Sequence, residues 1–140
     1  MTIIESVKTF IATYSGLTAS VPLSVDALGD TPTEYGIIQL PGNKIVESYI
    51  NGGSLREFPF AFQSTMSTAD ELERIINSGF YESFADWLES QTLAGTLPTM
   101  ETGKTAETIE AVGWGYIQDQ GDSGTAIYQV TCRLTYTQDP

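Results

Sequence analysis

The C-terminal part of the chain carries the clearest alternation of apolar and polar side chains. Between residues 125 and 137 every second residue is apolar, and the intervening positions are more polar. A period of two is the signature of a β-strand with one buried face. The apolar set consists of Ala126, Tyr128, Val130, Cys132, Leu134 and Tyr136. The pattern therefore predicts one long strand that buries a single face.

A second extended segment, residues 107–118, precedes this strand. The two are separated by a cluster of Gly, Asp and Ser at residues 119–124, which is typical of a chain reversal. The sequence therefore predicts a long antiparallel hairpin over residues 105–138 that forms the spine of a sheet.

The middle of the 107–118 segment is apolar on both of its predicted faces. One face holds Val112, Trp114 and Tyr116. The other holds Ile109, Ala111 and Ile117. A strand that is apolar on both faces has to be covered on both. Because few helices are predicted, we expect Val112, Trp114 and Tyr116 to form an interface with another subunit.

Two segments have the three- and four-residue apolar spacing of amphipathic helices. The first covers residues 2–15, where Thr2 and Glu5 fit a capping box. The second begins with a cap near Thr68 and ends near residue 91, and Gly79 is expected to divide or kink it. The face opposite its apolar stripe is mostly acidic, which indicates a solvated surface.

Shorter strands are predicted between the two helices. They cover residues 35–40, 44–51 and 55–63, and residues 21–25 form either a short strand or an extended segment. Pro59 cannot donate a backbone hydrogen bond, so the strand over residues 55–63 is expected at a sheet edge or with a bulge. Residues 93–104 form a long polar connection with Gly and Pro, which is either mobile or functional.

These elements define one domain over residues 1–140 with an α+β fold. We expect a mainly antiparallel sheet with a long C-terminal hairpin and with helices packed on one face. Hydrophobic residues make up 41% and charged residues 17% of the chain, which is typical of a globular protein.

The charge balance and the single cysteine narrow the classes of partner and compartment. Eighteen acids against six bases give a formal net charge of −12, which argues against direct binding of nucleic acid or anionic lipid. Cys132 cannot form a disulfide within the chain, which favours a reducing compartment, and its place in the strand pattern predicts a packing role. The sequence shows neither a signal-peptide pattern nor an apolar run of membrane-spanning length.

The chain contains no histidine, which removes the usual general base and the commonest transition-metal ligand. Glu107 and Glu110 lie three residues apart on a predicted strand, so they should face opposite sides and fail to act as an acid–base pair. Gly113 and Gly115 lie inside a strand pattern with no helix after them, so they indicate a bulge or a close approach rather than a nucleotide loop.

One arrangement of acids remains as an alternative. Glu82, Asp86 and Glu89 share a helix face and would converge on a cation only with oxygen ligands from a second element. The sequence therefore predicts no catalytic, cofactor-binding or metal-binding residues, and no enzyme activity.

Several blocks of the sequence resemble a known family. They are Asn77-Ser-Gly-Phe-Tyr-Glu-Ser-Phe-Ala-Asp-Trp-Leu-Glu89, Leu97-Pro98, Lys104-Thr-Ala106, Ile109-Glu-Ala111, Tyr128-Gln-Val-Thr-Cys-Arg-Leu-Thr-Tyr136, Pro41-Gly-Asn43 and residues 56–62. Over most of its length the chain resembles small proteins encoded by bacteriophages and prophages of Gram-positive bacteria. Members of this family are described as minor capsid or tail-completion proteins, and they are similar to the tail terminators of long-tailed phages.

The resemblance implies an α+β sheet with helices on one side and a hexameric ring that caps the tail tube and joins it to the head. It implies tail-tube and neck proteins as partners, and a location in the virion, or in the host cytoplasm during assembly. It provides no motif that maps an interface onto particular residues. Some members are labelled as chloramphenicol resistance proteins, but the acetyltransferases for that drug need a histidine base, which this chain lacks.

Three classes of function remain open at this point. The first is a phage structural protein, either a tail terminator or another neck or minor capsid protein. The second is an enzyme or small-ligand binding protein that uses carboxylates, which would require a deep pocket lined by acids from two separate elements. The third is an acidic inhibitor that mimics DNA, which would require the acids to gather along one groove-like face.

Overall fold

The computed structural model describes residues 2–17, 23–25, 34–42, 44–67, 71–120 and 124–140. The described residues form two helices and seven strands. The elements in chain order are α1 (Ile3–Ile11), β1 (Leu23–Val25), β2 (Glu34–Gln39), β3 (Ile45–Ser48), β4 (Ser54–Ser67), α2 (Glu71–Ala94), β5 (Lys104–Ala111), β6 (Tyr116–Gln120) and β7 (Thr125–Gln138). The predicted cap near Thr68 and part of the predicted turn at 119–124 lie outside the described residues.

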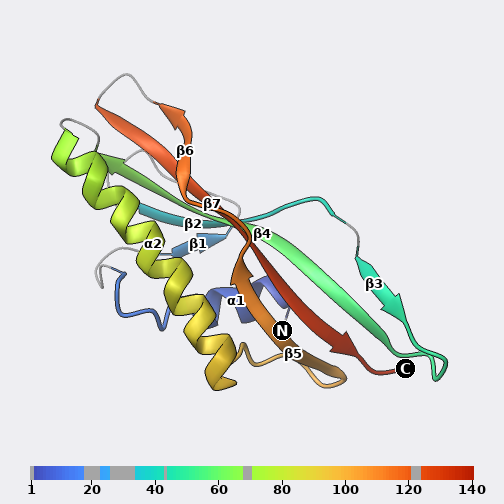
Figure 1. Cartoon of the computed structure of the whole chain (residues 1–140). Coiled ribbons are helices and arrows are strands. Elements are labelled where there is room, and N and C mark those ends of the chain that lie inside the picture. The colour runs from blue at the N-terminus through green and yellow to red at the C-terminus, as the bar shows by residue number, and fades with distance from the viewer. Residues whose placement is uncertain (1, 18–22, 26–33, 43, 68–70, 121–123) are drawn as a thin grey trace.

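The strands form one mixed sheet with the order β1-β2-β4-β7-β5, and β3 and β6 pair with β4 and β7 respectively. All pairs are antiparallel except the parallel pair of β1 and β2. The two longest strands, β4 and β7, each have 14 residues and pair along their whole length, from Ser54 opposite Gln138 to Ser67 opposite Thr125 (Figure 1). The C-terminal hairpin is present, but the centre of the sheet is the β4–β7 pair.

One face of the central pair is buried and carries the core. In β7 the exposure alternates residue by residue, as the apolar pattern predicts. The matching face of β4 carries Phe58, Phe60 and Phe62, and all three are buried. A period of two places these side chains on one side of both strands.

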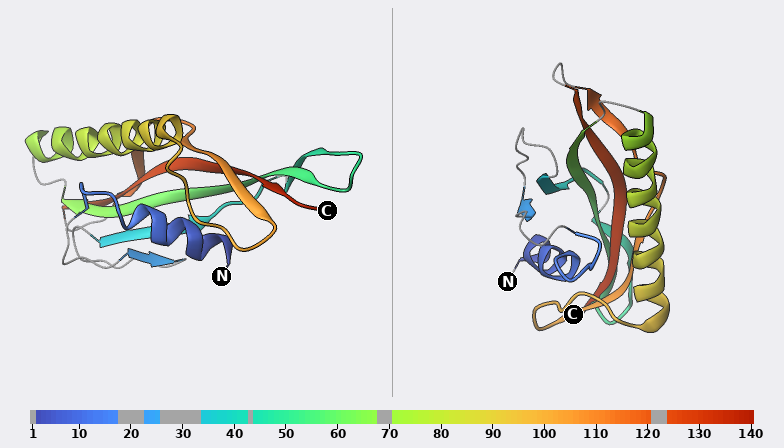
Figure 2. Two further views of the ribbon diagram at one scale, coloured as in Figure 1. Left: turned by 90° about the horizontal axis from the view of Figure 1, so that it is seen from below. Right: turned by 90° about the vertical axis from the view of Figure 1, so that its left-hand side faces the viewer.

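Both helices pack on this buried face, which confirms the predicted α+β arrangement. The ring of Phe62 stacks on Phe84 of α2 with centroids 4.5 Å apart. The two helices also touch each other, since the rings of Phe10 and Trp87 lie 5.1 Å apart. Figure 2 shows α2 along the β7 side of the sheet and α1 along the β1–β2 side.

The helix ends and the effect of Gly79 differ in part from the sequence expectations. The capping box of Thr2 and Glu5 is present, but α1 ends at Ile11 and not near residue 15. Beyond the helix the chain turns, and Tyr14 then packs 4.9 Å from Trp87. The second helix runs through Gly79 as one element of 24 residues, because its packing against the sheet outweighs the intrinsic cost of one glycine.

Pro59 lies in a central strand, so the prediction of an edge strand is wrong. The carbonyl of Pro59 accepts a hydrogen bond from the N–H of Leu40. In an antiparallel ladder the N–H and C=O of one residue point to the same side. The missing N–H therefore faces the gap between Gln39, where β2 ends, and Ile45, where β3 begins. The proline costs little because the hydrogen bond that it cannot donate falls one residue beyond the end of β2, outside the regular ladder.

The connection from α2 to β5, residues 95–103, packs against the body of the protein. Pro98 is buried, and Leu97 and Met100 pack against the core. Leu97 and Thr99 also line a small cavity beneath α1. Within the described residues, neither helix combines the length and the apolar character that crossing a membrane requires.

Candidate functional site

The predicted interface residues lie where the partner strand of the hairpin is interrupted. The prediction of a continuous strand over residues 107–118 is wrong, since β5 ends at Ala111 and β6 begins at Tyr116. Val112, Trp114 and Tyr116 are 48%, 77% and 48% exposed. Val112 still donates to the carbonyl of Thr131, and Tyr116 pairs with Gln129, so both lie on the open face of β7. The chain leaves the ladder only between them, at residues 113–115, and Trp114 reaches solvent there.

The packing of Tyr81 against Gly115 explains why the chain needs a glycine in this connection. A Cβ atom at Gly115 would lie 2.5 Å from the Cβ of Tyr81, which is closer than real side chains approach. No atom lies within 4 Å of the corresponding position at Gly113. The expected close approach is therefore found at Gly115, and its partner is a side chain of α2.

Tyr81 joins α2 to both central strands. Its hydroxyl lies 2.5 Å from the Oγ of Ser64 on β4 and donates to the carbonyl of Tyr128 on β7 over 3.1 Å. Burial raises the pKa of Tyr81, so the phenol stays protonated and acts as a fixed hydrogen-bonding group. This anchor holds α2 above the sheet next to the interrupted strand.

The C-terminal half of α2 is held against the free edge of β5. The hydroxyl of Thr92 donates to the carbonyl of Ile109 over 2.7 Å and accepts from its N–H over 3.1 Å. A side chain thus satisfies the two backbone groups that an edge strand would leave open at this position.

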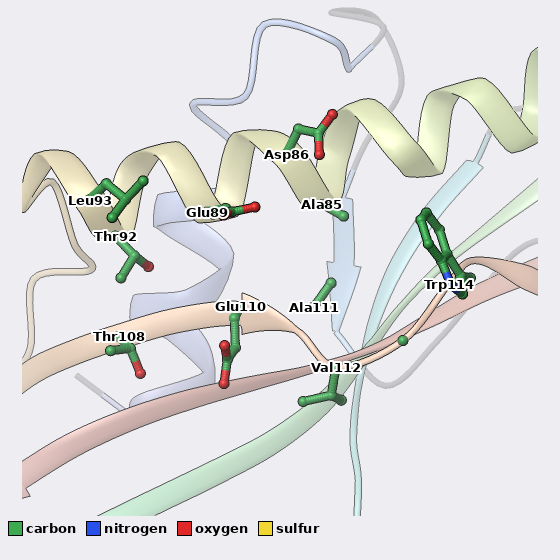
Figure 3. Close-up of a pocket in the computed structure, with 11 residues that line it drawn as sticks. Ala85, Asp86, Glu89, Thr92, Leu93, Thr108, Glu110, Ala111, Val112 and Trp114 are labelled. Carbon is green, nitrogen blue, oxygen red and sulfur yellow. The ribbon is translucent and has the colours of Figure 1, made fainter.

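A groove of about 480 Å³ lies between α2 and β5, and we call it the α2–β5 groove (Figure 3). Val112 and Trp114 line it, whereas Tyr116 does not. The hydroxyl of Tyr116 instead accepts a hydrogen bond from the side chain of Gln129. The structure therefore brings two of the three predicted interface residues to one concave surface.

The sequence pattern did not predict that other residues would line this groove. Leu93 and Ala85 come from α2, and Ala111 comes from the end of β5. Leu93 is among the most exposed large apolar side chains of the described residues. Only the tertiary contact between α2 and β5 shows that these apolar atoms line one surface with Trp114.

Three carboxylates also line the groove, from two different elements. Asp86 and Glu89 project from α2, and Glu110 projects from β5. Figure 3 shows Asp86 and Glu110 pointing away from each other. In the part of the chain that the structure describes, no group of three or more acidic, His or Cys residues could hold a metal ion, and this includes the Glu82–Asp86–Glu89 set.

Glu110 is paired with a base on the open face of the sheet. It accepts a hydrogen bond from the guanidinium of Arg133, which also lies 3.8 Å from Glu57. The hydrogen bond to Glu110 raises the pKa of Arg133, so this side chain stays charged.

The prediction that Glu107 and Glu110 face opposite sides is wrong because of a bulge. The register with β7 shifts between Ala106 and Thr108, which adds one residue at Glu107. Glu107 then contacts Thr137, and Glu110 contacts Arg133, on the same face of β7. Since Glu110 is bound to a guanidinium, the two acids still do not form an acid–base pair.

Cys132 is fully buried in the core, as the strand pattern predicts. Burial raises the pKa of its thiol, which keeps the sulfur protonated and unreactive.

We expect Cys132 in the native protein to resist a thiol-specific disulfide reagent at pH 8. The same thiol should react within minutes in denaturant, because unfolding exposes it and restores an ordinary pKa. Absorbance of the released chromophore measures both rates. Rapid reaction of the folded protein would contradict the burial of this side chain.

Neither a scan against protein-family models nor a search of curated proteins finds a match for this chain.

Proposed function

We propose that the chain is a non-enzymatic structural protein of a bacteriophage. It acts as a tail terminator, or head–tail joining component, by assembling into an oligomeric ring on the end of the tail tube, and the resemblance implies that this ring is hexameric. The resemblance of its sequence to phage tail-completion proteins supports this function. So does the sheet with helices on one face, which is the fold that the resemblance implies.

The observation that carries the proposal is the exposed Trp114 beside the α2–β5 groove. Trp114 is 77% exposed, and Val112 and Leu93 are exposed next to the same groove. Large apolar side chains that gather around a concave surface are typical of protein–protein contacts. An assembly function needs such a surface and needs no catalytic group.

The proposal is tested by measuring assembly directly. Light scattering of the purified protein should give a mass several times that of one chain, either alone or after addition of purified tail tubes. Electron microscopy should then show density at the tube end. Binding to heads or connectors in place of tubes would favour another neck or minor capsid protein. A chain that stays monomeric and leaves tail tubes uncapped would refute the proposal.

Replacement Trp114→Ala should weaken assembly and leave the monomer folded. Because the side chain is 77% exposed, the free energy of unfolding should change by less than about 0.5 kcal/mol. Self-association should weaken by about tenfold or more, as expected for an interfacial tryptophan. Sedimentation equilibrium and urea denaturation measure the two quantities. Loss of the folded state would show that Trp114 belongs to the core.

One observation favours a second candidate function, a carboxylate-based ligand-binding protein. Acids from two elements, Glu89 on α2 and Glu110 on β5, line the same groove. Calorimetry with spermidine, a small organic cation that carboxylates can bind through charge-assisted hydrogen bonds, tests this function. Binding that disappears in Glu89→Gln would support it, and the absence of heat at millimolar spermidine would remove its cation-binding form.

A further inference from the structure

We propose that the β3–β4 arm of one copy docks in the α2–β5 groove of the next copy, head to tail. The arm is the hairpin of residues 44–57, formed by β3 and the first residues of β4. This inference rests on the proposed function, because it names the contact that would build the ring.

The first residues of β4 pair with β7, but β3 exposes apolar side chains that none of the described residues covers. All four residues of β3 are exposed, and Figure 1 shows this strand extending away from both helices. The exposed large apolar residues of the arm are Ile45, Val46, Tyr49 and Ile50. Ile50, at the tip, is fully exposed. An apolar surface of this kind on a globular chain is typical of a binding surface.

The tip of the arm is held in a defined shape. The N–H of Tyr49 donates to the carbonyl of Gly53 over 2.8 Å, and the side chain of Asn51 accepts from the N–H of Gly53 over 2.9 Å. Gly52 has a φ of 93°, which a residue with a side chain would rarely adopt. A preformed hairpin loses little conformational entropy on docking, which favours its use as an inserted element.

The charge distribution indicates that the arm can approach another copy. The arm contains two bases and two acids, Lys44, Arg56, Glu47 and Glu57. Its formal charge is therefore zero, and the rest of the chain carries the whole net charge of −12. Two copies repel each other over most of their surfaces. A contact made through the neutral arm avoids this repulsion, because only the groove side of the contact is acidic.

The groove offers charges that complement the bases of the arm. Within the described residues, no ion pair includes Lys44 or Arg56, and none includes Asp86 or Glu89. The α2 helix as a whole carries five acids and one base. Lys44 and Arg56 of one copy would therefore meet an acidic rim around the apolar floor of the groove, which favours this register over an arm-to-arm contact.

The two surfaces are different parts of the molecule, and this determines the type of assembly. A contact between two unlike surfaces is heterologous, so each copy uses its arm on one neighbour and its groove on the other. Such contacts close into a ring when the rotation per copy permits. The arm and the groove thus provide the two different surfaces that a ring requires. A single self-complementary patch would give only a dimer.

Two complementary single variants test the docking. Ile50→Asp places a charge on the arm, and Trp114→Asp places a charge on the groove. Each variant alone should weaken self-association by about tenfold or more. A mixture should form a one-to-one dimer and nothing larger, because only one intact arm and one intact groove can meet. Sedimentation velocity measures these species, and circular dichroism checks that both variants are folded.

Disulfide cross-linking can detect the arm-to-groove contact even when self-association is too weak to measure by sedimentation. Ile50→Cys and Leu93→Cys introduce exposed thiols on the arm and in the groove, while the native Cys132 is buried. Under mild oxidation a mixture of the two variants should give a disulfide dimer. Lys8→Cys, on the exposed side of α1, replaces Leu93→Cys as the matched control and should give at least about fivefold less dimer with Ile50→Cys.

The outcomes separate this inference from the proposed function. If the wild-type chain assembles, both charged variants assemble equally well and no specific cross-link forms, the arm-to-groove contact is wrong and the ring function stands. If the wild-type chain neither assembles nor caps tail tubes, and no cross-link forms at high concentration, both are wrong. A specific cross-link together with a one-to-one dimer from the mixed variants supports the contact.

Discussion

Replacement Phe62→Ala should remove about 3–5 kcal/mol from the free energy of unfolding. Phe62 is fully buried on β4, and its ring lies within 6.2 Å of Phe80, Tyr81 and Phe84 on α2 by centroid distance. Truncation would leave a cavity at the contact that joins the sheet to the helix. Because small domains are stable by only about 5–15 kcal/mol, this loss is a large part of the total.

Urea denaturation followed by circular dichroism measures the effect of Phe62→Ala. The matched control is Trp114→Ala, which also truncates an aromatic side chain but at an exposed position. The control should unfold within about 0.5 kcal/mol of the wild-type chain. Equal losses in the two variants would contradict the assignment of Phe62 to the core and of Trp114 to the surface.

Replacement Gly115→Ala should destabilise the protein by about 1–3 kcal/mol through overpacking. The added methyl group would lie 2.5 Å from the Cβ and 2.6 Å from the Cγ of Tyr81. These atoms are next to the helix backbone, so relief requires a shift of α2 or of the connection. Either shift strains the hydrogen bonds of Tyr81 to Ser64 and Tyr128.

Gly113→Ala is the control for this effect, because its added methyl group meets no atom within 4 Å. Thermal unfolding should show a clear drop in midpoint for Gly115→Ala and little change for Gly113→Ala. A near-ultraviolet circular dichroism change confined to Gly115→Ala would report the displaced tyrosine. Similar midpoints for the two variants would show that Tyr81 does not press on Gly115.

Some elements were predicted correctly because their sequence patterns depend on interactions between residues that are close in the chain. The alternation in β7 follows from the geometry of an extended chain with one buried face, and the structure confirms it. The cap at Thr2 depends on a hydrogen bond to a residue three positions away, and it is present. Such features need no knowledge of distant segments.

The errors occur where a distant segment changes the outcome. The 113–115 connection leaves the ladder at the place where Tyr81 of α2 packs against Gly115. Pro59 is accommodated in a central strand because β2 and β3 leave a gap at that point. The bulge at Glu107 reverses the face of that side chain. Each of these depends on a pairing or packing partner that the local sequence does not reveal.

In the candidate site, too, some features follow from the local sequence and others depend on distant segments. The apolar character of Val112 and Trp114 is visible in the sequence, and both line the groove. The predicted grouping with Tyr116 assumed a straight strand, and the interruption separates Tyr116 from the other two. Leu93 joins them only because Thr92 holds the end of α2 against the edge of β5.

The sequence by itself determined the α+β class, the buried face of β7, the capped first helix and the inward position of Cys132. It did so because these features depend on periodicity and on contacts within a few residues. The tertiary structure alone decided that β4 is the main partner of β7, that α2 is continuous, and that Trp114 is exposed beside a groove. These features depend on how segments far apart in the chain pack together, and burial is a property of that packing.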